Sequence, residues 1–355
     1  MPDISLGDAR RLGVRLLTRH KVSEKNAAPT VESLLRAEME GIPSHGFSRI
    51  PYYVGQTDTG KVDGHAEPAV TRPKPGVVRV DAHCGFAFRA FAEGLPELAA
   101  AAREQGIALM GVCNSHHAGV LGFPVADLAA QGLLALGFAN SPASLAPYGG
   151  CKGVFGTNPL ALACPRKAAR PLVIDLSMGL LARGKVLQAA KKGELIPEGA
   201  AVDAEGKPTR DAAKAFAGAL LPFGGPKGYA LALMVEILAG LLPGAALAME
   251  ASSLFTPEGP APRLGQSFIA IDPGSLAGAD FADRLESLLR AITEQPGARL
   301  PGDRRIQRRE AALAAGGITL PSTGGIGTTL FYVVGGGLMV AAIVLLVTKK
   351  RMENK

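Results

Sequence analysis

The sequence predicts an α/β fold, because apolar runs of strand length alternate with amphipathic stretches of helix length along most of the 355 residues. The composition is that of a folded protein, with 47% hydrophobic and 19% charged residues, a balance that disordered chains lack. A chain of this length can bury a sizeable core, and we expect it to form two lobes.

The elements can be assigned in chain order from these patterns. Residues 5–20 form an amphipathic helix, with an apolar stripe of leucine and alanine among arginines. A second helix covers residues 31–40 and ends at a Gly and a Pro, so residues 44–46 fall on the following loop. The other predicted strands are 77–80, 107–112, 133–138, 172–174 and 268–271, and the other helices are 97–105, 125–131, 183–192, 229–242, 281–294 and 304–315.

Polar residues follow the apolar runs where strands are predicted to end. Asn114 and His117 come after the strand at 107–112, and Asp175 ends the strand at 172–174. Ligands of α/β sheets gather at the carboxyl ends of strands. We therefore expect these residues to lie near a ligand site.

Histidines in short Ser-, Asn- and Gly-rich stretches are the most informative residues. His45, His116 and His117 are three of the six histidines, and each lies in such a stretch. Histidine carries protons near neutral pH, and Arg49 offers a planar fork suited to a carboxylate. One such motif alone is more often structural than catalytic, but their combination predicts proton transfer on a small anionic substrate.

Several common site types are missing from the sequence. The only near match to GxGxxG lies at Gly325 and Gly327, inside an apolar tail with no strand before it. The four cysteines are far apart without a CxxC pair, so we expect free thiols and no metal site. The net charge of +7 includes +3 from residues 320–355, and the small, scattered excess elsewhere predicts no nucleic-acid partner.

Eight short segments match a known family in order: GIPSHG (41–46), SRIP (48–51), NSHH (114–117), APYGG (146–150), GTNP (156–159), ARGK (182–185), KGY (227–229) and RLPG (299–302). On these segments, residues 1–319 resemble the malate/L-lactate dehydrogenase family, which is unrelated to the Rossmann-fold lactate and malate enzymes. The resemblance implies the family's own non-Rossmann α/β fold with two interleaved lobes, in a homodimer. It also implies reduction of 2-oxo acids or related cyclic imines with NADH or NADPH.

The resemblance also implies roles for individual residues. His45 resembles the family's proton donor or acceptor, with Ser44 beside it, and Arg49 resembles the clamp on the substrate carboxylate. His117 stands at a second histidine position, and the choice between His45 and His117 as acid/base stays open. Hydrogen bonds to substrate or nicotinamide are implied for Thr157 and Asn158.

Three segments resemble those that contact the dinucleotide, NAD or NADP. Lys227 opens a predicted helix beside glycines, where a cation and free backbone N–H groups suit a pyrophosphate. The residues concerned are Asp175, Leu176, Ser177, Lys227, Gly228, Pro301, Gly302 and Asp303.

Two positions depart from the family pattern. Ala118 replaces an aromatic residue after the second histidine, which we expect to open the pocket. Lys185 stands where the cyclic-imine reductases of the family carry an aspartate that completes a Ser-His-Asp relay. This departure favours a 2-hydroxy acid, such as malate or lactate, with a cyclic-imine reductase as the alternative. A second alternative is a catalytically inert surface protein.

The C-terminal residues 320–355 have a different character. The sequence LPSTG is followed by an uncharged stretch, with an apolar block of 18 residues at 330–347 and a basic tail at 349–355. This order resembles the LPxTG sorting signal of Gram-positive surface proteins, in which a sortase cleaves between Thr323 and Gly324. A helix of the block's length spans about 27 Å, close to the ~30 Å core of a bilayer. We therefore predict a membrane helix in preference to a buried core helix.

The two parts indicate different locations. The first helix carries arginines but no continuous apolar core, so we expect no export signal and a cytoplasmic body. The tail instead suggests membrane insertion or cell-wall anchoring. We interpret the chain as a chimera of a dehydrogenase body, residues 1–319, and a sorting signal, residues 320–355, joined at a Leu-Pro that both patterns share.

Overall fold

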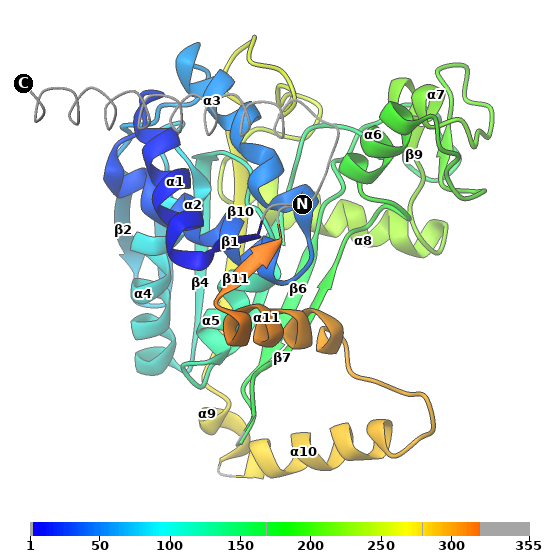
Figure 1. The fold of residues 1–355 in the computed structure, drawn as a ribbon. Coiled ribbons are helices and arrows are strands. Elements are labelled where there is room, and N and C mark those ends of the chain that lie inside the picture. The colour runs from blue at the N-terminus through cyan, green and yellow to red at the C-terminus, as the bar shows by residue number, and fades with distance from the viewer. Residues whose placement is uncertain (1–2, 168, 279, 320–355) are drawn as a thin grey trace, which may run out of the picture.

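A computed structural model describes residues 3–167, 169–278 and 280–319. At its centre lies a seven-stranded sheet in the order β2-β3-β4-β10-β5-β6-β7 (Figure 1). The strands are β2 (Ala69–Lys74), β3 (Val77–Asp81), β4 (Ile107–Ser115), β10 (Leu264–Ile271), β5 (Leu134–Ala139), β6 (Leu160–Cys164) and β7 (Leu172–Leu176). The predicted tail elements, including the sorting motif and the helix at 330–347, lie outside the described residues.

The sheet is mixed, because only β3 and β4 pair in parallel and all other neighbours are antiparallel. As a result β3, β4, β5 and β7 run in one direction, and β2, β10 and β6 run in the other. Leu264 at the start of β10 pairs with Ser115 at the end of β4, and Leu160 pairs with Leu176 in the same way. The carboxyl ends of β4 and β7 therefore lie on the same side of the sheet as the residues that precede β6 and β10.

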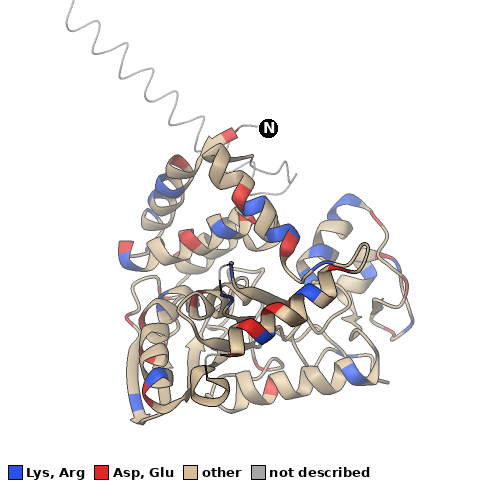
Figure 2. Ribbon diagram, turned by 90° about the horizontal axis from the view of Figure 1, so that it is seen from below, with Lys and Arg blue, Asp and Glu red and all other residues tan. Residues whose placement is uncertain are grey.

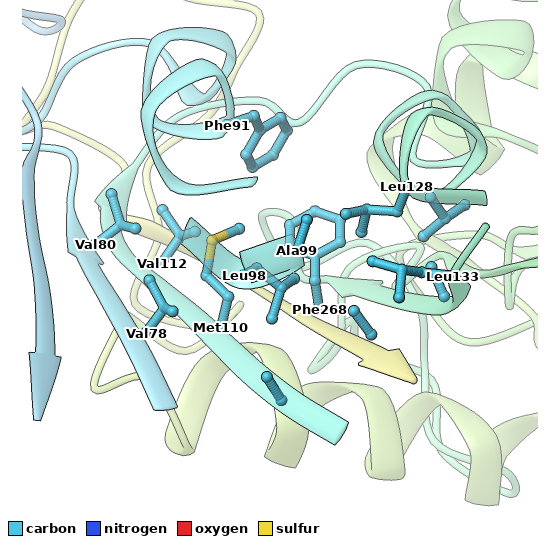
Figure 3. Packing of buried hydrophobic residues seen from close by; sticks show 14 of the residues in the cluster. Val78, Val80, Phe91, Leu98, Ala99, Met110, Val112, Leu128, Leu133 and Phe268 are labelled. Atoms are coloured by element: carbon cyan, nitrogen blue, oxygen red, sulfur yellow. The ribbon is translucent and has the colours of Figure 1, made fainter. Parts of the chain in front are cut away.

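The main core lies between this sheet and the helices α4 (Ala87–Gln105) and α5 (Gly122–Ala129). Figure 3 shows Phe91 of α4 above the strand side chains, among them Met110 and Phe268. Gly94 allows α4 to approach closely, since a Cβ there would lie 2.6 Å from Met110 Sδ. Burying a side chain of the size of Met110 stabilises the fold by roughly 1.5–3 kcal/mol.

The opposite side of the sheet is covered by α8 (Pro226–Glu236) and the π-helix η3 (Ile237–Leu241), which contact β5 and, for η3, β10. A separate cluster of buried residues, built on α6 (Arg183–Lys192), α7 (Ala212–Ala217), β8 (Ala201–Val202) and β9 (Ala219–Leu220), forms one lobe. Two further helices, α9 (Gly274–Ala277) and α10 (Asp280–Thr293), follow β10.

The N-terminal helices form another lobe with its own core, made by α1 (Leu6–Thr18), α2 (Glu24–Met39) and α3 (Ile50–Asp58). Two serines cap α1 and α2, because Ser5 and Ser23 accept hydrogen bonds from backbone N–H groups in the first turns. The chain returns to this lobe through α11 (Asp303–Ala315) and β11 (Gly317–Thr319), which pairs antiparallel with β1 (Asp3–Ser5). The two lobes are therefore interleaved in sequence.

Most predicted elements are present, with shifted ends. The helix predicted at 31–40 begins earlier, at Glu24, where Ser23 caps it, and it continues through Pro29. The patterns missed α3, β2 and β6, as well as the small pairs β1–β11 and β8–β9. Residues 44–46, expected on a loop, lie in the first of two short 3-10 turns and at the junction between them; the turns are η1 (Pro43–His45) and η2 (Phe47–Arg49).

The described residues carry no long apolar helix of the kind that crosses a membrane. All four cysteines are free thiols, as expected. Within the same residues, no group of three or more His, Cys, Asp or Glu side chains is arranged to hold a metal ion. Figure 2 shows Lys and Arg interspersed with Asp and Glu along the helices.

Candidate active site

A cavity of about 290 Å³ lies where η1, η2, the end of β4 and the start of α6 come together. His45, Arg49, His117 and Thr157 line it, so four residues predicted from sequence meet in one place. The remaining wall is formed by Ser141, Pro142, Ala143, Ser144, Ala182, Arg183, Gly184, Ala248, Met249, Ala251, Ser253, Leu254 and Phe255.

The two cavity histidines stack on each other, with ring centroids 5.3 Å apart and planes inclined by 27°. Ser44 Oγ lies 3.0 Å from His45 Nδ1, and Tyr53 Oη lies 2.8 Å from His117 Nδ1. Each ring is thus held at Nδ1 by a hydroxyl group. Nε2 is the nitrogen that each ring retains for a ligand.

Burial keeps these histidines neutral. It lowers the pKa of His45 to about 3, with a further contribution from the Arg49 cation. The pKa of His117 is lowered well below its usual value by the same two causes in the same order. Both rings can therefore accept a proton at neutral pH, but neither is a proton donor while Arg49 stands without an anion.

His116 has a different role from its neighbour His117. Its Nε2 lies 2.9 Å from Gln56 Oε1, and its ring meets those of Tyr53 and Phe86 edge-on. Burial also lowers the pKa of His116 to about 3. His116 is buried outside the cavity lining, and its contacts make it a packing residue.

Arg49 is only 6% exposed. Its Nε donates to the Ser44 carbonyl at 2.7 Å, and its guanidinium lies 5.0 Å from the centre of the Phe255 ring. Burial lowers the pKa of Arg49, with the neighbouring tyrosines acting in the opposite direction. Among the described residues no carboxylate pairs with this guanidinium, so its outer N–H groups are left for a ligand anion.

Glu38 on α2 fixes the turn that carries His45 and Arg49. Its Oε1 accepts a hydrogen bond from the Phe47 N–H at 2.7 Å. A Cβ at Gly46 would lie 2.2 Å from the same oxygen, so only glycine fits there without displacing Glu38. Burial raises the pKa of Glu38 to about 7.

The structure separates Thr157 from Asn158. The Thr157 N–H donates to Ser141 Oγ at 3.1 Å, which fixes the residue at the cavity wall. Asn158 has φ +37° and is fully buried, and its Nδ2 donates to Glu236 Oε2 at 2.8 Å and to the Ala232 carbonyl at 3.0 Å. Asn158 therefore ties the strand start to α8 and lies outside the cavity lining.

Two residues that depart from the family pattern lie away from the cavity lining. Ala118, expected to open the pocket, instead borders a different cavity of about 440 Å³, which includes Phe88 and Phe91 in its lining. Lys185 lies on the exposed side of α6. Neither substitution reshapes the histidine cavity directly.

The residues expected to contact the dinucleotide form a path away from this cavity. Ser177 Oγ lies 3.4 Å from the Thr157 carbonyl, and Leu176 beside it is 46% exposed. Asp175 Oδ2 accepts hydrogen bonds from the Gly122 N–H at 3.1 Å and from Arg305 Nη1 at 3.4 Å. Burial raises the pKa of Asp175, and Arg305 acts against this.

A second cavity of about 250 Å³ continues this path beside Gly302 and Arg305. Gly302 has φ +87° and precedes α11, and Asp303 Oδ2 accepts the Leu300 N–H at 3.0 Å. Pro301 and Asp303 border a small third cavity with Arg166 and Arg170.

Lys227 and Gly228 lie in the first turn of α8. A Cβ on Gly228 would lie 1.9 Å from the Phe223 carbonyl oxygen, so this close turn requires glycine whatever else the segment binds. The described part of the chain shows no contact between Lys227 and an acidic side chain.

Sequence reasoning missed Tyr53, Glu38, Phe255 and Arg183. Tyr53 carried the only available signal, since it follows the SRIP segment by two residues on what proved to be α3. Arg183 lay inside a matched segment, but nothing in the sequence placed it against Arg49.

The family model for malate/L-lactate dehydrogenase matches residues 4–324. The chain belongs to this family. The dehydrogenase is accordingly an NAD(P)-dependent oxidoreductase with the α/β fold of that family. A model of the LPXTG cell wall anchor motif matches residues 313–354, so the chain also carries this motif.

Sequence similarity to curated relatives extends over most of the chain. The dehydrogenase is 46% identical over 302 residues to a (2R)-3-sulfolactate dehydrogenase (NADP(+)) of Chromohalobacter salexigens, covering 85% of this chain and 90% of the relative. It is 42% identical over 321 residues to a Δ1-pyrroline-2-carboxylate/Δ1-piperideine-2-carboxylate reductase of Pseudomonas aeruginosa, covering 90% and 96%.

Solved structures agree in fold. The Δ1-piperideine-2-carboxylate reductase of Pseudomonas syringae pv. tomato superposes with a TM-score of 0.86 at 39% identity, covering 90% of this chain and 97% of that one. The sulfolactate dehydrogenase of Methanocaldococcus jannaschii gives a TM-score of 0.81 at 29% identity, covering 90% and 94%.

Proposed function

We propose that the dehydrogenase transfers a hydride between NADH or NADPH and a small 2-oxo or 2-hydroxy acid, with His45 or His117 moving the proton. The observation that carries this proposal is the pair of neutral, stacked histidines beside a buried Arg49 that has no carboxylate partner. The nicotinamide supplies the hydride to C2 of the 2-oxo acid. The protein supplies the proton and the charge that holds the carboxylate.

Arg49 binds the substrate carboxylate with its two outer nitrogens, because its Nε is already used by the Ser44 carbonyl. The hydroxyl oxygens of Ser44 and Tyr53 hydrogen-bond with Nδ1 of His45 and His117, which leaves Nε2 of each ring for the substrate. Thr157, held by Ser141, donates a hydrogen bond to the substrate or the nicotinamide. Asn158 positions the Thr157 segment through its hydrogen bonds to α8.

Anion binding also makes the proton available. The pKa of His45 is low because of burial and because of Arg49. A carboxylate on Arg49 offsets that cation, so the pKa of the adjacent histidine rises and the ring takes up a proton more readily. The imidazolium then donates this proton to the C2 oxygen as the hydride arrives, and the reverse reaction returns it.

The residues that would hold the dinucleotide lie along the path from the histidine cavity to α11. Ser177 and Leu176 lie nearest the cavity, and Asp175 follows, joined to the far end by Arg305. Gly302 with its neighbours Pro301 and Asp303 forms the far end, where Arg305 and Arg170 lie beside the cavities. Lys227 and Gly228, at the start of α8, complete the set of residues proposed to contact the dinucleotide.

We also propose that the enzyme acts as a homodimer, as the family resemblance implies.

A cyclic-imine reductase is the second candidate, because the Pseudomonas relatives are named for that activity. The same Arg49 and histidines suit an imine carboxylate, but Lys185 replaces the relay aspartate. Nicotinamide absorbance, followed with hydroxy acids, 2-oxo acids and cyclic imines in both directions, tests both candidates. Folded protein that turns over none of them contradicts the proposal and favours the inert surface protein.

The tail is a separate functional unit, residues 320–355, attached to the enzyme body, residues 1–319. We propose that its apolar block inserts into a membrane and that a sortase recognises the motif and cleaves between Thr323 and Gly324. The body works in the cytoplasm, where reduced nicotinamide cofactor is available.

A further inference from the structure

A second arginine faces the active-site cavity from the side of α6. Arg183 lines the cavity together with Arg49, and none of the described residues lining it is acidic. The Arg183 Nη2 donates to the Phe216 carbonyl at 3.2 Å, and burial lowers the pKa of Arg183. The cavity therefore holds two guanidinium groups and no compensating carboxylate.

Aromatic rings hold the two guanidiniums in place. Arg183 lies 4.5 Å from the centre of the Phe216 ring, and Arg49 lies 5.0 Å from that of Phe255. The two rings contact each other edge-on, with centroids 6.3 Å apart. Arg49 and Arg183 are thus positioned by one aromatic pair, and neither is free to swing toward a distant surface acid.

The backbone brings the second anion site close to the first. A Cβ on Gly184 would lie 3.8 Å from Arg49 Nη2, so the start of α6 faces Arg49 directly. This helix has ten residues, its N-cap is Ala182 without a side-chain hydrogen bond, and its first turn has no acidic residue. Uncapped N–H groups at a helix start favour an anion, as Arg183 does.

An uncompensated cation in a partly buried cavity is unfavourable, and an anion from the ligand relieves it. Other arginines in the second cavity differ in this respect: Arg36 pairs with Asp127, Arg305 with Asp175 and Arg170 with Glu310. Those side chains are already neutralised by the protein. Among the described residues that line these two cavities, Arg49 and Arg183 are the arginines without a carboxylate partner.

We propose that the substrate carries two anionic groups, the C1 carboxylate on Arg49 and a second carboxylate or sulfonate on Arg183 and the start of α6. The inference rests on the proposed function and narrows its substrate to short 2-oxo diacids. A monoanion such as pyruvate, or a cyclic imine carboxylate, leaves Arg183 unpaired.

The test compares substrates that differ in charge. Initial rates of the full chain with NADPH and NADH are measured with oxaloacetate, 3-sulfopyruvate, pyruvate and a cyclic imine. The kcat/KM for the better of the two diacids is expected to exceed that for pyruvate by about 10²-fold or more. Equal efficiency with pyruvate, or a preference for the imine, overturns the inference while leaving the proposed oxidoreductase function standing.

Arg183 variants locate the preference. Arg183→Gln is expected to lower kcat/KM for the diacid about 10²-fold, to change that for pyruvate less than about threefold, and to leave the KM for the cofactor unchanged. Arg183→Lys, which keeps the charge, is expected to restore part of the loss. A variant that raises the cofactor KM and spares the diacid would show that Arg183 binds the cofactor, and the inference would fail.

Arg210→Gln is the matched control. Arg210 lies in the same lobe, donates to the Ile196 carbonyl and does not line the cavity, so its loss should affect all substrates alike. Calorimetric binding of malate and of lactate, with reduced cofactor present so that no hydride can be transferred, gives a readout without turnover. If the enzyme reduces no substrate, the proposed function fails, whereas binding of lactate as tightly as malate refutes the diacid preference by itself.

Discussion

A hydrogen bond of 2.8 Å joins the hydroxyl group of Tyr53 on α3 to Nδ1 of His117, although the two residues are 64 positions apart in sequence. The phenol stays protonated because burial raises the pKa of Tyr53. His45, stacked on His117, has its own hydroxyl partner in Ser44. The two candidate proton carriers therefore have equivalent supports, and only variants can distinguish them.

Replacing each histidine by alanine should separate the proton carrier from its neighbour. The carrier is expected to lose roughly 10²-fold or more in kcat, and the other histidine much less. Removing the supporting hydroxyl should repeat the effect in weaker form, through Ser44→Ala for His45 or Tyr53→Phe for His117. Steady-state kcat at saturating cofactor is the measurement, and equal losses for both histidines would contradict a single carrier.

Arg49→Lys keeps the charge but removes the two-nitrogen fork. The KM for the acid is expected to rise about tenfold or more, while cofactor affinity changes little. Fluorescence titration with NADPH and initial rates against the acid measure the two effects separately. Weaker cofactor binding with an unchanged KM for the acid would show that Arg49 does not hold the carboxylate.

Binding of an anionic acid should be accompanied by proton uptake. In the free enzyme the pKa of His45 is about 3, lowered by burial and then by Arg49. A bound carboxylate offsets the Arg49 cation but not the burial, so the histidine pKa rises and proton uptake on binding increases as the pH falls. Calorimetry in two buffers with different ionisation enthalpies gives the number of protons. No uptake anywhere between pH 5 and 7 would rule out this coupling.

Glu38 should make stability depend on pH in a direction opposite to that of a paired carboxylate. Its pKa is about 7 when folded, against 4.5 in the unfolded reference, so the folded state holds the proton more tightly. The contribution of Glu38 to the free energy of unfolding is therefore most favourable below pH 4.5. It declines as the pH rises to 7 and is constant above. The change amounts to about 3 kcal/mol.

Glu38→Gln removes this titration and keeps an oxygen for the Phe47 N–H. Urea unfolding of both proteins at pH 5 and 8 cancels the shared contribution of the buried histidines. We expect wild type to lose stability relative to Glu38→Gln between these two pH values. A difference that does not change with pH would mean that Glu38 is already ionised at pH 5.

Truncation after Thr319 tests the separation of body and tail. The shortened protein keeps β11 and its pairing with β1, as well as every residue of the proposed site. We expect unchanged kcat and KM, with less aggregation than the full chain because the apolar block is gone. Soluble truncated protein that no longer binds cofactor would show that the tail belongs to the enzyme.

Local patterns predicted helices and strands well where a regular spacing of apolar residues continues over a whole element. In α6 the bounds match the prediction. The patterns missed α3, which begins at Ile50 with Pro51 in its first turn and has little amphipathic contrast. The mixed sheet could not be predicted, because β10 enters between β4 and β5 from more than a hundred residues away. Strand neighbours depend on such distant packing, which no local period contains.

The candidate site was predicted in part. Motifs brought forward His45, Arg49, His117 and Thr157, all of which line one cavity. The same motifs grouped His116 with His117 and Asn158 with Thr157, since adjacent residues share every sequence signal. Only the alternation of side chains about the backbone separates a cavity residue from a buried one. Phe255 lies in a segment with no recognisable pattern, and Arg183 lies in the matched ARGK segment, but no local signal showed that it lines the same cavity.

The short pairing of β1 with β11 would have a mechanical consequence for a tethered enzyme. Ser5 faces Gly317 next to the helices α1 and α11. Asp3 and Thr319 form the outer pair, at the end where both strands leave the body. A pull on the C-terminal segment would first load the hydrogen bonds between β11 and β1. The cavity is formed by η1, η2, β4 and α6, and none of its lining residues belongs to this strand pair. An enzyme held this way would lose the β1–β11 pairing as its first response to load.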